Sequence, residues 1–129
     1  MHEVKTKEAD SKALDYRIAL VGNPNVGKSV LFGLFTGKYV TVSNYPGTTV
    51  EVTRGMYAGS NDTIEVVDTP GANSLISHSE DERVARDILL RDEEKKVLQI
   101  MDAKNIHRGL LITTQLAEMG LPISIGLNM

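Results

Sequence analysis

The stretch Gly22-Asn23-Pro24-Asn25-Val26-Gly27-Lys28-Ser29 decides the predicted fold, because it fits the phosphate-loop pattern GxxxxGK[ST]. The apolar run Ile18–Val21 before it is typical of a buried strand. After it, Leu31, Leu34 and Phe35 recur at helical spacing, which predicts an amphipathic helix. A strand, this loop and a helix, in that order, form the context in which the pattern binds phosphate.

The residue types of this loop suit a nucleotide with Mg²⁺. Its two glycines let backbone N–H groups turn inward around phosphate oxygens, and the start of the next helix adds unpaired N–H groups and a positive dipole end. Lys28 is predicted to neutralise the β- and γ-phosphates, and the Ser29 hydroxyl to complete a Mg²⁺ shell. Every residue of the loop is a predicted nucleotide contact: Gly22, Asn23, Pro24, Asn25, Val26, Gly27, Lys28 and Ser29.

Length and composition predict a single soluble domain. The chain has 129 residues, of which 1–16 are read as a polar tail and 17–129 as the domain. The net charge of −3 argues against nucleic acid as a partner, and the lack of cysteine excludes disulfides and thiolate metal sites. No apolar run in the sequence approaches the ~20 residues that span a bilayer.

The segment after the first helix predicts a loop followed by a hairpin. Residues 38–49 are polar, contain Pro and Gly, and are too many for a simple turn, so we expect a mobile loop. Residues 50–56 alternate as a strand does, and the turn-forming residues 59–62 lead into apolar positions within 64–67. The predicted β-hairpin delivers Asp68 to the end of a strand.

The sequence Asp68-Thr69-Pro70-Gly71 follows that strand at once. In phosphate-loop enzymes an acid in this place holds a water of the Mg²⁺ shell, and a glycine three residues later offers its N–H to the γ-phosphate. On its own, a DxxG pattern is more simply a strand that ends in a Pro-Gly turn. The phosphate loop upstream favours the functional interpretation, in which Asp68, Thr69, Pro70 and Gly71 all contact the nucleotide.

A capping box predicts the next helix. Ser79 and Glu82 have the S-x-x-E spacing, in which each side chain satisfies a backbone N–H of the other residue. The charged residues around this helix, 80–82 included, are interpreted as its solvated face. Its predicted apolar face consists of Val84, Ala85, Ile88 and Leu89.

The last part of the chain predicts a strand, a helix and a strand. Residues 97–101 are an apolar run of strand length, Asn105 is placed to cap a helix that ends at Gly120, and residues 122–127 form the final strand. The apolar residues expected on that helix are Ile106, Leu110 and Ala117. Strands that alternate with helices favour a doubly wound α/β sheet, mostly parallel with one antiparallel hairpin, and a ligand at the carboxyl ends of the strands. Because the chain stops directly after a strand, we expect its C-terminal part to be missing.

Four stretches, taken in order, resemble the N-terminal GTPase domain of FeoB, the bacterial ferrous-iron transporter. They are Gly22–Ser29, Asn44–Glu51, Asp68–Gly71 and Leu127–Met129, and the likeness extends from about Arg17 to the end of the chain. The resemblance implies a three-layer P-loop NTPase fold of the Ras-like GTPase kind, on the cytoplasmic face of a membrane protein. It also implies the membrane transport domain of the same polypeptide as a partner, and GTP or GDP, Mg²⁺ and K⁺ as bound groups.

The resemblance implies roles for single residues as well. Thr49 matches the threonine that completes the Mg²⁺ shell in the GTP state, with Gly47 and Thr48 beside it at the nucleotide. Asn25 matches an asparagine implicated in binding a K⁺ that replaces an arginine finger, and Asn128 matches the first residue of the guanine-reading NxxD motif. The implied catalytic residues are Lys28, Asn25, Thr49 and Gly71; the implied metal ligands are Ser29 and Thr49 directly, Asp68 through water, and Asn25 for K⁺.

Two departures from the family pattern bear on function. The Asp expected three residues after Asn128 lies beyond Met129, so this chain is expected to discriminate guanine poorly. Ala72 stands where Ras-type enzymes carry a water-orienting glutamine, so slow hydrolysis is expected.

The other candidate residues favour structural roles. His2, His78 and His107 have no ligand spacing, so no iron site is expected in this chain. Tyr45 either lies over the nucleotide or covers a loop, and the sequence leaves both alternatives open.

Three hypotheses about function follow. The first is a Mg²⁺-dependent GTPase that regulates a ferrous-iron transporter. The second is a stand-alone GTPase of the ribosome-assembly kind, which would bind RNA through an added basic module. The third is a binding module without significant hydrolysis, in which the nucleotide only orders the loops for a partner. The uncovered last strand also leaves open the formation of an oligomer.

Overall fold

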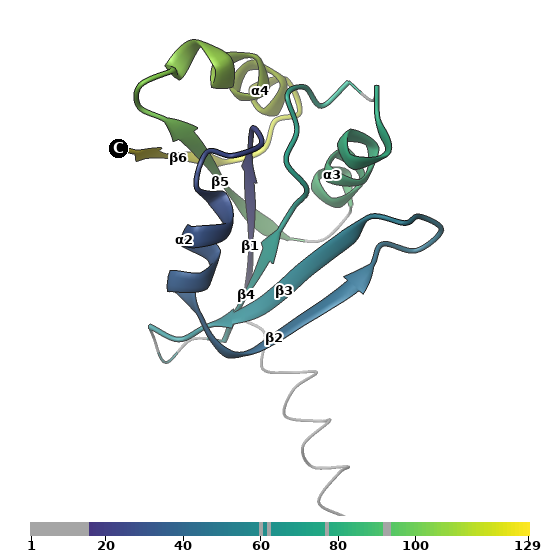
Figure 1. Cartoon of the computed structure of the whole chain (residues 1–129), viewed down its shortest axis with the longest axis vertical. Coiled ribbons are helices and arrows are strands. Elements are labelled where there is room, and N and C mark those ends of the chain that lie inside the picture. Colours follow the sequence, from purple (N-terminus) through teal and green to yellow (C-terminus); the bar gives the residue numbers. More distant parts are fainter. Residues whose placement is uncertain (1–15, 60, 62, 77, 92–93) are drawn as a thin grey trace, which may run out of the picture.

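A computed structural model describes residues 16–59, 61, 63–76, 78–91 and 94–129, so the predicted tail lies outside the described residues except for Tyr16. The described residues form one mixed sheet with three helices (Figure 1). The strands are β1 (Tyr16–Gly22), β2 (Thr36–Asn44), β3 (Glu51–Tyr57), β4 (Ile64–Asp68), β5 (Lys95–Asp102) and β6 (Ile123–Asn128), and the helices are α2 (Lys28–Phe35), α3 (Glu80–Leu90) and α4 (Ile106–Glu118).

The sheet has the strand order β2-β3-β4-β1-β5-β6. Strands β4, β1, β5 and β6 are parallel, whereas β2, β3 and β4 pair in antiparallel fashion. The predicted α/β architecture and the hairpin of β3 and β4 are therefore confirmed. A second antiparallel pair, β2 with β3, was not predicted.

The prediction that residues 38–49 form a loop is wrong for most of the segment. Strand β2 extends through Asn44 and pairs Val40 with Gly55 and Val42 with Thr53. It is an edge strand whose residues 40–44 are all exposed, Val42 by 56%, so the polar composition reflects a solvated strand rather than a loop. The β-branched run Val40-Thr41-Val42 is the feature that favours a strand here. Only residues 45–50 connect β2 to β3.

Helices cover both faces of the sheet, which gives the three layers expected (Figure 1). Alternation along β1 explains how, because Leu20 faces α2 while Ala19 and Val21 face α3 and α4. On the α2 side, Phe32 packs with Leu20 and Val66. Leu34, predicted to lie on the apolar face, is 76% exposed. None of the described helices is long and apolar enough to span a membrane.

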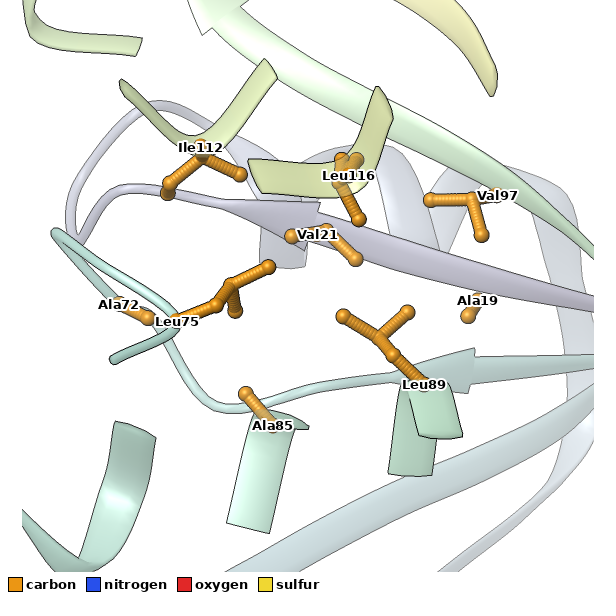
Figure 2. Packing of buried hydrophobic residues seen from close by; sticks show 9 residues of the cluster. All are labelled: Ala19, Val21, Ala72, Leu75, Ala85, Leu89, Val97, Ile112 and Leu116. Atoms are coloured by element: carbon orange, nitrogen blue, oxygen red, sulfur yellow. The ribbon is translucent and has the colours of Figure 1, made fainter. Parts of the chain in front are cut away.

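The largest described cluster of buried apolar side chains lies between the sheet and helices α3 and α4 (Figure 2). Figure 2 shows Ile112 and Leu116 of α4 on one side of the cluster and Ala85 and Leu89 of α3 on the other. The loop after β4 also takes part, so the chain just beyond Gly71 is anchored in the core. The cluster consists of Ala19, Val21, Ala72, Leu75, Ala85, Leu89, Val97, Ile112 and Leu116.

The buried face of α4 differs from the predicted one. Ile106 and Leu110, two of the apolar residues predicted to mark this helix, are 41% and 45% exposed, and the third, Ala117, is exposed as well. The buried face of α4 does not show the apolar spacing of a typical helix, because two of its residues are not large and apolar. Gln115 is polar, and Gly109 has no side chain and packs closely against Met101. The helix begins after Asn105, as predicted, although the Asn105 side chain makes no capping hydrogen bond. The residues of α4 that are buried are Gly109, Ile112, Gln115 and Leu116.

The first prediction tests this orientation of α4 with two leucines of the same helix. Leu116→Ala should lower the free energy of unfolding by about 2–5 kcal/mol, since it opens a cavity at a side chain with 0% exposure. Leu110→Ala, at a position that is 45% exposed, should cost less than about 1 kcal/mol. Urea denaturation of both variants measures the difference, and equal losses would contradict the structure.

Candidate functional site

The phosphate loop and the DxxG loop predicted from the sequence meet at one edge of the sheet, where the parallel strands end. The phosphate loop leaves β1 at Gly22 and enters α2 at Lys28, and Asp68 ends the neighbouring strand β4. In the pairing of these strands Leu20 stands opposite Asp68, so both loops start at the same level. Together they enclose a depression of about 470 Å³, lined by Asn23, Pro24, Asn25, Gly27, Lys28, Ser29, Val30 and Gly71.

The backbone of the phosphate loop needs residues that adopt a left-handed conformation. Asn25 has φ 64° and Gly27 has φ 94°, and asparagine and glycine are the residue types that adopt such values most readily. Gly27 directly precedes α2, and a Cβ atom at this position would overlap the side-chain amide of Asn128. Asn128 donates from Nδ2 to the carbonyl of Val26 over 2.9 Å. The end of β6 therefore braces the loop.

Lys28 and Asp68 form an ion pair at the floor of the site. The Lys28 ammonium donates to Asp68 Oδ1 and, over 2.5 Å, to the carbonyl of Thr69. Lys28 is only 8% exposed, and an ammonium group at that depth has to be paired with negative charge. The fold thus brings Lys28 and Asp68 into contact, and their action on a nucleotide stays a prediction.

The donors expected for Mg²⁺ are partly assembled. Ser29 Oγ lies 3.3 Å from Asp68 Oδ2, so a hydroxyl and a carboxylate, both hard oxygen donors, stand side by side at the mouth of the loop. These residues fit a Mg²⁺ ion that takes its other ligands from phosphates and water. Within the described residues no group of three or more His, Asp and Glu side chains that could hold a metal ion gathers. His2 lies outside that part of the chain.

Hydrogen bonds join the DxxG loop to the end of β1 and to the first residue of the phosphate loop. The Thr69 hydroxyl and N–H donate to the carbonyl of Leu20 over 2.6 and 3.2 Å, and the Ala72 N–H donates to the carbonyl of Gly22 over 3.0 Å. Between them, a Cβ on Gly71 would lie 3.0 Å from Pro24 Cα, so this close approach needs glycine. Gly71 thus lies beside the loop, as its predicted role requires.

Asn23 links the site to α4, which the sequence did not reveal. Its amide nitrogen lies 3.1 Å from the carbonyl of Arg108, 3.3 Å from Asn73 Oδ1 and 3.4 Å from the carbonyl of Ala72. Asn23 is 2% exposed, so these acceptors replace water around a buried amide. The pattern GxxxxGK[ST] leaves this position free, and only the tertiary fold shows that a polar side chain is required there.

The loop between β2 and β3 is held by its own threonines. The Thr48 hydroxyl donates to the carbonyl of Tyr45 over 2.9 Å and accepts from the Val50 N–H over 3.1 Å, around a turn in which Gly47 has φ 78°.

Tyr45 is 8% exposed in a cluster with β3, β4 and α3, and its ring lies 5.4 Å from the Arg91 guanidinium carbon. Of the two alternatives for Tyr45, the structure supports the one in which it covers the loop.

Thr49 does not lie among the described residues that line the depression. Instead, its hydroxyl and its N–H donate to Glu80 Oε1 over 2.8 and 3.0 Å. The Thr49 hydroxyl, followed by its N–H, holds the pKa of the Glu80 carboxyl below its ordinary value, so the acceptor stays ionised. The interpretation of Glu80 as part of a solvated face therefore missed a contact between the loop before β3 and the first residue of α3.

The capping box forms in one direction only. Ser79 Oγ accepts from the Glu82 N–H over 3.1 Å, as predicted. The Glu82 carboxylate, however, accepts from the Ser74 N–H over 3.2 Å and from the His78 N–H over 3.1 Å, rather than from Ser79. The start of α3 thus holds the end of the DxxG loop as well as the loop before β3.

The P-loop GTPase fold is a mixed sheet with helices on both faces, in which a phosphate loop follows the first strand and a DxxG loop follows the neighbouring parallel strand. The described residues have this arrangement. The particular family follows from comparison with known proteins. The family described as ferrous iron transport protein B matches residues 16–129, so the chain belongs to this family. The resemblance noted in the sequence is thereby confirmed.

Curated relatives are similar over most of this chain. The Fe(2+) transporter FeoB of Methanocaldococcus jannaschii is 46% identical over 105 residues, which is 81% of this chain and 16% of that protein. The Fe(2+) transporter FeoB of Salmonella typhimurium is 39% identical over 116 residues, 87% of this chain and 15% of that protein. The chain therefore spans only about a sixth of the length of these two relatives.

Solved structures agree with the fold. A mutant S. thermophilus NFeoB bound to GDP has a TM-score of 0.83 and 46% identity, over 88% of this chain and 44% of that one. The G domain of the T. maritima FeoB iron transporter has a TM-score of 0.82 and 37% identity, over 87% of this chain and 70% of that one.

The second prediction concerns the crowded glycine of the phosphate loop. Gly27→Ala should lower the free energy of unfolding by at least about 1–2 kcal/mol, because it forces a side chain into the left-handed region and against Asn128. Gly33→Ala is the matched control, since it lies exposed within α2 with no atom in its way, and should be neutral or gain up to about 1 kcal/mol. Thermal denaturation compares the two; a harmless Gly27→Ala would show that the loop geometry is wrong.

Proposed function

We propose that this chain is a GTP-binding and GTP-hydrolysing domain. The observation that carries the proposal is the buried Lys28 ammonium, paired with Asp68 at the floor of a depression between the phosphate loop and Gly71. A cation in that place, surrounded by loop N–H groups and the start of a helix, suits a chain of phosphates. The GDP bound to the similar S. thermophilus NFeoB supports a guanine nucleotide as the ligand.

The proposed contacts with the nucleotide follow the two loops. The phosphate loop cradles the α- and β-phosphates through its backbone N–H groups, and Lys28 bridges toward the γ-phosphate. Gly71 donates its N–H to the γ-phosphate, and Gly47, Thr48 and Thr49 close over it from the other side. The proposed set is Gly22, Asn23, Pro24, Asn25, Val26, Gly27, Lys28, Ser29, Gly47, Thr48, Thr49, Asp68, Thr69, Pro70, Gly71 and Asn128.

Ser29, Thr49 and Asp68 would hold Mg²⁺, Asp68 through a water molecule. The ion would neutralise charge on the β- and γ-phosphate oxygens. The neighbouring Ser29 hydroxyl and Asp68 carboxylate support this assignment. Thr49 is held by Glu80, so its part requires that the loop before β3 moves.

Hydrolysis transfers the γ-phosphoryl group of GTP to water, giving GDP and phosphate. Lys28 and the Gly71 N–H would stabilise charge on the phosphoryl oxygens, which is how such enzymes act. Ala72 is 1% exposed and apolar, so it cannot orient the attacking water, and the reaction is expected to be slow. Asn25 is exposed at the rim of the depression and is the proposed ligand of K⁺, which would supply the positive charge that an arginine finger provides elsewhere.

Asn128 is the proposed start of the guanine-binding motif. Its side chain already donates to the carbonyl of Val26, so the same residue that would meet the base also supports the phosphate loop. Base and phosphate binding are coupled through this one amide.

We further propose that the domain lies on the cytoplasmic face of the membrane and regulates a ferrous-iron transport domain of the same polypeptide. Membership of the ferrous iron transport protein B family supports this role and disfavours the ribosome-assembly alternative. The remaining alternative, a nucleotide-binding module without significant hydrolysis, is separated by measuring phosphate release from GTP.

The third prediction tests the proposed phosphate contact. Lys28→Ala should weaken binding of both GDP and GTP by at least about 2 kcal/mol, roughly thirtyfold, because the lost bonds to phosphate are charge-assisted. Lys104→Ala, which removes the same charge from an exposed position after β5, should change the affinity by less than about twofold. Titration with fluorescent nucleotides measures both, and unchanged binding by Lys28→Ala would refute the site.

The fourth prediction tests the monovalent cation. Phosphate release should be faster in K⁺ than in Na⁺ at equal ionic strength, because Asn25 is proposed to hold a K⁺ ion where charge develops in the transition state. Asn25→Ala should abolish this difference and leave nucleotide affinity within about threefold of the parent, since the lost contact is one neutral amide. A persistent K⁺ response in that variant would remove Asn25 from the mechanism.

A further inference from the structure

Two hydrogen bonds join the loop before β3 to the first residue of α3. The hydroxyl and the N–H of Thr49 both donate to Glu80 Oε1, over 2.8 and 3.0 Å. Bonds to an ionised acceptor are roughly twice as strong as neutral ones, so this one oxygen holds Thr49 firmly. Glu80 itself is fixed by the helix that it begins, next to the Ser79 cap. The contact therefore attaches a loop residue to a rigid element.

While it is bound to Glu80, Thr49 stands outside the described lining of the depression, which contains the proposed metal ligand Ser29. Ser29 lines the depression with its hydroxyl 3.3 Å from Asp68 Oδ2, whereas Thr49 is absent from the described lining. Under the proposed function, Thr49 approaches Ser29 only with a bound triphosphate, since the γ-phosphate and its ion are what order such a loop. Both Thr49 donors must leave Glu80 for this to happen.

We propose that Glu80 is a positioning residue that determines how the site discriminates between nucleoside diphosphate and triphosphate. The inference rests on the proposed function and adds the control of that same site. Diphosphate binding does not need Thr49 and leaves its bonds to Glu80 intact. Triphosphate binding needs the released loop, so its apparent affinity is lowered by the fraction of molecules in which Thr49 is free of Glu80.

The neighbouring acids of α3 do not share this role. Glu82 accepts from the N–H groups of Ser74 and His78, so it serves the other loop. Asp81 is exposed and, within the described part of the chain, makes no hydrogen bond to Thr49. Asp81 carries the same charge at the next position of the same helical turn, which makes Asp81→Ala the matched control for lost charge and for a weakened helix start.

The fifth prediction follows. In Mg²⁺, Glu80→Ala should raise the affinity for a non-hydrolysable GTP analogue by roughly three- to tenfold, the effect of removing one or two net hydrogen bonds that oppose binding, and leave GDP affinity within about twofold. Glu80→Gln, which keeps a neutral acceptor, should give a smaller change, and Asp81→Ala should shift both nucleotides equally. In a Thr49→Ala background, Glu80→Ala should no longer change the ratio of the two affinities.

The test uses the 129-residue chain, titrated with each nucleotide, and hydrogen exchange of the Thr49 amide as a second measurement. Faster exchange in Glu80→Ala but not in Asp81→Ala, together with the shifted ratio, supports the inference. Nucleotide binding with the same ratio in parent, Glu80→Ala and Asp81→Ala overturns the inference and leaves the proposed function in place. A parent chain that binds neither nucleotide overturns both.

Discussion

The ion pair between Lys28 and Asp68 is the interaction on which the rest of the structure depends. An ammonium group that is 8% exposed is costly unless a carboxylate meets it, and the carboxylate here comes from 40 residues further along the chain. The pair forms because β4 lies directly beside β1, with Leu20 opposite Asp68. The hairpin of β3 and β4 is thus more than a connection, since it delivers the negative charge that the phosphate-loop lysine requires.

A second constraint is the burial of polar side chains between the site and α4. Asn23 reaches the carbonyl of Arg108, and Gln115 accepts from the Leu75 N–H over 2.7 Å and donates to Ser74 Oγ over 2.9 Å. Gln99 is 0% exposed and donates to the carbonyl of Gly109 over 2.8 Å. Because a buried polar group is costly when unpaired, each bond resists displacement of its partner. The chain from Ala72 to Leu75, which follows the DxxG motif, is therefore bonded to α4 through Gln115 and to the start of the phosphate loop through Gly22.

The parts of the fold that the sequence predicted are those governed by local rules. The phosphate loop, the Ser79 cap and the strands β1 and β5 follow from spacing and from unbroken apolar runs. Strand β2 and the buried face of α4 did not follow. Residues 40–44 of the edge strand β2 are all exposed and show no buried apolar face, and a face of α4 that includes Gly109 and Gln115 breaks the apolar period. Within the site, motif spacing located Lys28, Ser29, Asp68 and Gly71, but the bonds of Asn23 depend on residues 49 to 85 positions away.

The start of α3 shows most clearly why such contacts escape a local analysis. Acidic residues in the first turn of a helix are favourable in any case, because they meet the positive end of the helix dipole. Glu80 and Glu82 satisfy that rule whether or not they touch anything else, so their sequence context carries no trace of a second role. Yet Glu80 holds Thr49 from the loop before β3, and Glu82 holds Ser74 and His78 from the loop after β4. One helical turn thereby joins the two loops that flank the phosphate site, and a movement of either loop has to break bonds to this turn.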